Sequence, residues 1–309
     1  MSNITMTSTT AIVLNFISLI ETIFIGVMSI FMFSVLLRSI IRNRDVVLIL
    51  VANSYVALLA FALIAIVNNI DIVRADFNLY TAEETFSCRI KGFIIYSFMA
   101  VIFNTFALQA AFRFFRVVYS SSIWLQYSLT YAVIIPILWL ISFLFLLPVH
   151  AWHDIQLMST ENICVLAIHS ARGFIWSTIF IYGLPMNIIN TIYFQLARFM
   201  RRSPLPTSAR TKRDVIVIHR IVLVVIILIL MGAPSVVLEL MLPFTDVGKP
   251  LFYRISNMTI VTAMLALSFM LVYVTPQVTE ILMRIGKQHQ VIPTYSQPRF
   301  GLPSTTIKR

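Results

Sequence analysis

Residues 46–70 read VVLILVANSYVALLAFALIAIVNNI, 25 consecutive positions without a charged side chain. A helix needs about 20 apolar residues to cross the roughly 30 Å hydrocarbon core of a bilayer, because each residue advances it by 1.5 Å. This stretch therefore predicts a membrane-spanning helix, and it sets the question of how often the rest of the chain crosses.

Five other charge-free windows are long enough to span, and one further apolar stretch, 11–37, contains a single carboxylate, Glu21. The five windows are 92–112, 117–149, 173–197, 221–238 and 255–279. The predicted fold class is an all-α membrane protein, a seven-transmembrane helix bundle. The helices are expected at about 11–37, 46–70, 90–117, 124–148, 173–199, 214–240 and 253–276, with an extracellular N-terminus at 1–10, a short inner helix at 277–288 and a flexible cytoplasmic tail at 289–309.

The composition agrees with this. Of the 309 residues 59% are hydrophobic and 11% are charged, whereas a soluble domain carries about 25% charged residues. An ordinary water-soluble enzyme and a disordered chain are both excluded. Residues 1–10 hold no Lys or Arg, and the first apolar stretch is longer than the 7–15 residues of a signal-peptide core, so we expect this helix to stay in the membrane.

The basic residues orient the bundle. With the N-terminus outside and the C-terminus inside, 17 of the 23 Lys and Arg residues fall in cytoplasmic segments, as the positive-inside rule requires. The net charge of +11 then faces anionic lipid headgroups, and we expect membrane lipids but no nucleic acid as partners. The expected location is the plasma membrane, as a multi-pass protein.

Two cysteines fall on the predicted outer side, Cys88 before the third helix and Cys164 in the loop after the fourth. An oxidising compartment favours a disulfide between them; the alternative is two unpaired buried thiols. Asn3-Ile4-Thr5 is a glycosylation sequon, which makes Asn3 a predicted glycosylation site.

Several spacings resemble those of rhodopsin-like (class A) G-protein-coupled receptors over about residues 11–288. Arg113 follows Cys88 by 25 residues and is followed by Phe114; Pro185 precedes Tyr193 by eight; Asp214 precedes Pro234 by twenty. Trp139 and Pro276 match the family's tryptophan in helix four and proline near the end of helix seven.

The chain also departs from the family pattern. Phe112 replaces the acid before the arginine, and Ser54 stands where helix two usually has an acid. Gly232 replaces the aromatic residue before the helix-six proline, and Thr275-Pro276-Gln277-Val278-Thr279 lacks the usual Asn and Tyr.

The resemblance implies a receptor that binds an extracellular ligand and couples to a heterotrimeric G protein, with arrestin as a further candidate partner. It places the activation switch at Arg113, Phe114, Tyr193, Asp214, Pro234 and Pro276. An Arg113–Asp214 ion pair would close the inner face until helices three and six separate. The alternatives are that Arg113 is one more positive-inside residue, that Asp214 is a helix-start acid, and that the prolines are static kinks.

The ligand cavity is expected between the outer halves of helices three, five, six and seven. Its candidate residues are Lys91, Ile95, Tyr96, Met99, Trp176, Ser177, Ser235 and Glu239. Ile95 occupies the place where aminergic relatives carry an Asp, so the ligand is not expected to be a biogenic amine; a peptide is one candidate. For each residue a packing role is an open alternative.

Other functions fit less well. A transporter usually shows paired halves and Gly-interrupted helices, but Gly is only 8 of 309 residues. A retinal-binding light sensor needs a lysine in helix seven, and the window 255–279 has none. The windows hold no paired carboxylates or His/Asp metal set, so no catalytic residue, metal or cofactor is expected. A transporter or channel without G-protein coupling stays the alternative function.

Overall fold

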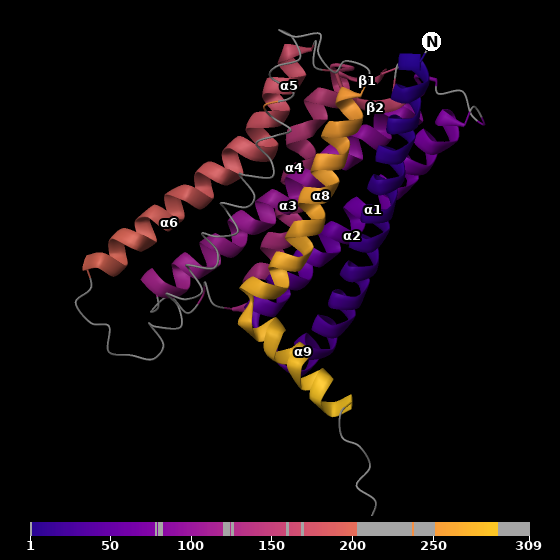
Figure 1. The fold of residues 1–309 in the computed structure, drawn as a ribbon. Helices are drawn as coiled ribbons and strands as arrows, with labels where there is room; N and C mark the ends of the chain where they lie inside the picture. Colours follow the sequence, from indigo (N-terminus) through magenta and orange to yellow (C-terminus); the bar gives the residue numbers. More distant parts are fainter. Residues whose placement is uncertain are drawn as a thin grey trace, which may run out of the picture.

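The computed structural model describes residues 2–77, 79, 83–119, 124, 127–158, 161–167, 170–202, 237 and 251–289. In these ranges long helices lie side by side, and a short hairpin covers one end of the bundle near the N-terminus (Figure 1). The elements are α1 (Ser2–Arg42), α2 (Val46–Asp76), α3 (Phe86–Val118), α4 (Ser128–Ala151), β1 (Ile155–Met158), β2 (Ile163–Leu166), α5 (Ala171–Thr178), the π-helical segment η2 (Ile179–Gly183), α6 (Leu184–Arg202), α8 (Phe252–Val274) and α9 (Pro276–His289). We call the end with the hairpin the disulfide end and the other the opposite end.

Six helices in the described residues are long and apolar enough to cross a membrane. They cover Thr9–Arg42, Val46–Asp76, Phe86–Val118, Ser128–Ala151, Ala171–Phe199 and Phe252–Val274. The prediction of a mostly helical, multi-pass membrane protein is confirmed at this level. The expected crossing at 214–240 lies outside the described residues apart from Val237, as does the tail beyond residue 289.

The outward faces of the bundle are apolar. Val27 on α1 and Leu140 on α4 are each 60% exposed, and similar large side chains run along both helices. Apolar surface in water costs about 25 cal/mol per Å², so these faces fit lipid rather than water. α2, which packs on α1 and α3, is the most buried of the six spans and forms the centre of the core.

Polar side chains inside the bundle bond to one another across helices. The Trp139 indole donates to the Asn53 carbonyl oxygen at 3.1 Å, and the Asn53 amide donates to the Thr105 hydroxyl at 3.2 Å. The Gln109 amide donates to Ser54 at 2.7 Å. These bonds join α2, α3 and α4, and they satisfy polar groups that would have no partner if they faced lipid.

Several helices run further than predicted. α1 covers residues 2–42 instead of 11–37, because no proline or glycine interrupts the chain before Gly26, and α2 ends at Asp76 instead of 70. That residues 1–10 are extracellular stays a prediction. α4 begins at Ser128 rather than 124. The short helix expected at 277–288 is present as α9.

The loop between α4 and α5 contains the β1–β2 hairpin, which the sequence did not reveal. Its strands are antiparallel, with Leu157 opposite Cys164. Strands of four residues are too short to show a clear alternation of polar and apolar positions.

Candidate functional site

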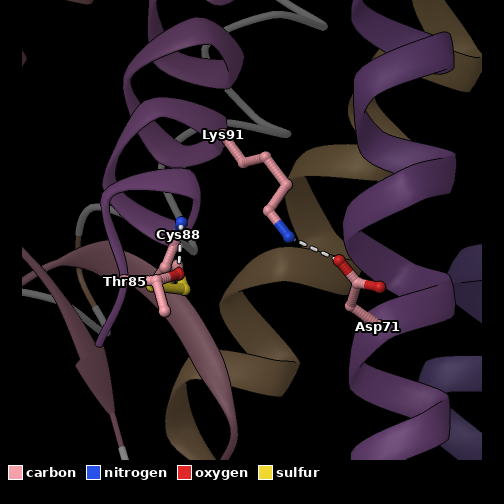
Figure 2. The surroundings of a disulfide bond; sticks show 5 residues. Asp71, Thr85, Cys88 and Lys91 are labelled. Carbon is pink, nitrogen blue, oxygen red and sulfur yellow. Dashed lines mark hydrogen bonds and ion pairs between the residues drawn. A yellow bond between two sulfur atoms is a disulfide. The ribbon is translucent and has the colours of Figure 1, made fainter. Parts of the chain in front are cut away.

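The hairpin is bonded covalently to the start of α3. Cys88 on α3 and Cys164 on β2 form a disulfide with 5.6 Å between their Cα atoms, as predicted. The Thr85 hydroxyl caps α3 by accepting from the Cys88 N–H at 3.3 Å (Figure 2). One turn later, a Cβ at Gly92 would lie 2.7 Å from Ile155 Cγ2. The hairpin can therefore lie directly on α3 only because residue 92 has no side chain.

The hairpin turn is also held by charge, through Glu161. Its fully buried carboxylate accepts from the backbone N–H groups of Tyr253 at 3.2 Å and Arg254 at 2.9 Å. These are the first residues of α8, where the helix dipole favours an anion. Burial raises the pKa of the Glu161 carboxyl above its ordinary value, against the lowering effect of these two backbone hydrogen bonds and of the Arg254 charge.

Arg254 connects this turn to α2. Its guanidinium makes two hydrogen bonds to the Asp76 carboxylate, at 2.7 and 2.6 Å, and donates to the Glu161 carbonyl oxygen at 3.1 Å. The Asn15 amide of α1 donates to the same Asp76 carboxylate at 2.6 Å. The side chains of Asp76 and Arg254 are only 8% and 5% exposed, so this bidentate pair fixes the disulfide ends of α1, α2 and α8 together.

A cavity of about 120 Å³ lies against the hairpin at the disulfide end. Its walls come from α2, α3, β2, α5, η2 and α8. The lining residues are Phe61, Ala65, Asn68, Asn69, Gly92, Ile95, Tyr96, Met99, Phe103, Cys164, Val165, Leu166, Phe174, Ser177, Thr178, Ile181, Tyr182, Tyr253, Ser256, Asn257, Ile260, Ala263 and Met264.

Four of the predicted pocket residues line this cavity: Ile95, Tyr96, Met99 and Ser177. That the cavity takes a ligand stays a prediction. Ser235 and Glu239 lie outside the described residues.

Lys91 and Trp176 are not part of the cavity wall, and both have other contacts. The Lys91 ammonium forms an ion pair with Asp71 on α2 (Figure 2). The Trp176 indole donates to the Phe145 carbonyl oxygen of α4 at 2.7 Å and packs against Trp152. The polar group of each of these two residues bonds to a neighbouring helix, which agrees with the packing role given above as the alternative.

One wall of the cavity comes from a widened helical turn. Pro185 has no N–H and its ring crowds the preceding turn, and the five residues of η2 come just before it. The Leu184 N–H accordingly donates to the Ile179 carbonyl oxygen, five residues back. Tyr182 of this segment packs on Phe103 of α3, with ring centroids 4.5 Å apart.

At the opposite end, Arg113 and Tyr193 lie near enough to interact electrostatically. Arg113 is half-buried on α3 and Tyr193 is buried on α6. Phe114 packs beside Phe115, with ring centroids 5.9 Å apart. The proposed partner of Arg113, Asp214, lies outside the described residues, as does Pro234.

Pro276 is not a kink inside a spanning helix, which corrects the prediction. It is the first residue of α9, directly after the extended Thr275 that ends α8. Proline is favoured at this first position because its missing N–H would have no helical partner there. The residue therefore separates two helices.

Asn3 lies in α1, and its glycosylation stays a prediction.

Sequence reasoning missed the Asp76–Arg254–Glu161 group. A signal was present, since Asp76 and Arg254 each lie just beyond an apolar window, where paired charges are common. Whether they pair depends on which helices are neighbours, and the apolar segments of the sequence do not show that.

No protein-family model matches this chain, and no curated protein matches its sequence.

Proposed function

We propose that this chain is a rhodopsin-like G-protein-coupled receptor with seven spans, its N-terminus outside the cell and its C-terminus inside. It would bind an extracellular ligand in the cavity at the disulfide end and signal to a heterotrimeric G protein at the opposite end. The observation that carries the proposal is that one helix, α3, contributes to both places. Tyr96 and Met99 line the cavity, and Arg113 lies near Tyr193 at the other end.

The direction of the described helices supports seven crossings. α6 ends at the opposite end, whereas α8 begins at the disulfide end (Figure 1). One further crossing would carry the chain from the end of α6 to the start of α8, and the apolar window 221–238 is available for it. The orientation rests on the basic residues, which place the disulfide end outside.

The signalling step in this proposal is a change in the spacing of α3 and the sixth crossing. An ion pair between Arg113 and Asp214 would hold the two together at rest. Such a partly buried pair contributes about 1–2 kcal/mol, between the exposed and buried limits, which is enough to bias a two-state equilibrium about tenfold.

The test is agonist-free signalling in cells, measured as second-messenger levels at matched surface expression. Asp214→Ala should raise the basal signal several-fold, and Asp214→Ala combined with Arg113→Ala should return it to background. An epitope at the N-terminus should be stained on intact cells. Staining that requires permeabilised cells, or second-messenger levels unaffected by both variants, would refute the proposal.

A further inference from the structure

The cavity at the disulfide end is small, and this limits what it can hold. An engineered apolar cavity of about 150 Å³ in another protein takes up one benzene molecule, and the cavity here is about 120 Å³. A single ring or a short chain therefore fits, whereas a folded peptide segment does not.

The walls are chiefly aromatic and aliphatic. Phe61 of α2, Met99 and Phe103 of α3, and Met264 of α8 face the same space. Apolar walls of this kind stabilise a ligand by removing its hydrocarbon surface from water, by about 25 cal/mol per Å².

Two uncharged polar side chains of the lining are buried: Asn68 on α2, 6% exposed, and Ser177 on α5, 5% exposed. The neighbouring Asn69 already accepts a hydrogen bond from Asn257 at 3.3 Å. In a mostly apolar cavity a few polar groups fix the orientation of a ligand. Asn68 and Ser177 are therefore the candidate hydrogen-bonding groups for a bound molecule.

The described lining residues carry no charge. The nearby charges are already engaged, Lys91 with Asp71 and Arg254 with Asp76. An ammonium or a carboxylate that entered would lose its hydration without gaining a counter-charge from these walls. The described walls therefore favour a neutral molecule.

From size, walls and polar groups together we infer that the cavity binds a compact, uncharged molecule of one ring or a short chain, whose hydroxyl or carbonyl group is recognised by Asn68 and Ser177. This inference rests on the proposed receptor function and names the ligand class for the same cavity. It also replaces a peptide with a small neutral compound as the expected ligand.

Five probes that share one benzene ring test this: benzyl alcohol, acetophenone, toluene, benzylammonium and benzoate. Each is added to the purified full-length protein in detergent, and the unfolding temperature is followed by tryptophan fluorescence to obtain an apparent dissociation constant. Benzyl alcohol and acetophenone should bind about tenfold more tightly than toluene, because of the added hydrogen bond. The two charged probes should bind more weakly than toluene.

Variants locate the binding. Asn68→Leu should remove the tenfold advantage of acetophenone over toluene, while toluene binding persists. Ser177→Ala should reduce the advantage of benzyl alcohol, and Met99→Trp, which fills the space, should weaken all five probes. Ser97→Ala is the control, because the Ser97 hydroxyl is also buried on the same bundle but does not line the cavity; it should leave the ranking unchanged.

Stronger binding of benzylammonium or benzoate than of benzyl alcohol would overturn the inference. An unchanged ranking in Asn68→Leu together with unchanged affinities in Met99→Trp would overturn it as well. The assay contains no G protein, so its failure is separable from failure of the receptor proposal. Ranked binding without any cellular signal would count against the receptor, and an Arg113-dependent signal without ranked binding would count against the ligand class alone.

Discussion

Asp76 and Arg254 form the most buried ion pair in the described part of the chain, with side chains 8% and 5% exposed. Removing one partner of such a pair leaves an uncompensated buried charge and typically costs about 3–5 kcal/mol. We expect Arg254→Met to destabilise by this amount, because the Asp76 carboxylate then keeps only the Asn15 amide as a partner. Asp76→Leu should cost an amount near the lower end of this range, because the guanidinium then keeps the Glu161 carbonyl oxygen and the charge of the Glu161 carboxylate.

The double variant Asp76→Leu/Arg254→Met should be more stable than the sum of the single costs predicts. It removes both charges together, so its cost is the two hydrogen bonds lost by Asn15 and by the Glu161 carbonyl oxygen, about 1 kcal/mol each, and the loss of the Arg254 charge near the Glu161 carboxylate. The single costs sum to roughly 6–8 kcal/mol, so the cycle should depart from additivity by more than about 1 kcal/mol.

The assay is reversible unfolding in mixed detergent micelles, followed by tryptophan fluorescence. Arg172→Met is the control, because Arg172 is 59% exposed and only its partner Asp154, 3.5 Å away, is buried at 7%; a pair with one solvated partner should cost less to break than the Asp76–Arg254 pair. Single costs that add to within about 0.5 kcal/mol, as independent sites do, would show that the two side chains are not energetically coupled and would refute the reasoning.

Three further predictions concern stability. Burial raises the pKa of the Glu161 carboxyl, so the folded state holds this proton more tightly than the unfolded state, and stability should rise as the pH falls from 7 toward the ordinary carboxyl pKa of 4.5. Glu161→Gln should remove this dependence of the unfolding temperature on pH. An identical slope in both proteins would be the contrary result. Gly92→Ala should destabilise by about 1–3 kcal/mol through overpacking against the hairpin, whereas Gly26→Ala, whose new Cβ would meet its neighbour at an ordinary 3.7 Å, should stabilise by roughly 0.5–1 kcal/mol; equal effects would contradict the close contact. Trp139→Phe should cost about 1–3 kcal/mol because the buried Asn53 oxygen loses its donor, and an unchanged unfolding midpoint would show that this bond is not needed.

The sequence predicted the spanning helices well because their determinant is local. A charge-free length of about 20 residues is a property of one segment, and it placed the starts of α2 and α8 within one residue of where they are observed. The disulfide followed from the shared side of Cys88 and Cys164. What could not be predicted depends on neighbours: Lys91 pairs with Asp71 instead of lining the cavity.

The same reason explains the incomplete account of the cavity. Tyr96 and Met99 were expected from their place on one helix, but Asn68 on α2 was not, because no pattern within 46–70 shows that this face meets α8. The hairpin was missed because its turn is held by Glu161 through tertiary contacts. Pro276 was misplaced because a proline at the first residue of a helix and one inside a helix look alike in sequence.

Two stretches of chain run from the cavity to Arg113 and Tyr193, and they differ in how far the helix is interrupted. Between Gly92 and its end at Val118, α3 contains neither proline nor glycine, so it is an uninterrupted helix over the 14 residues, about 21 Å, from Met99 to Arg113. The chain through α5, η2 and α6 is interrupted by a five-residue π-helical turn and by Pro185. A displacement that begins at the cavity would therefore shift α3 as a whole, whereas the neighbouring stretch would bend at η2.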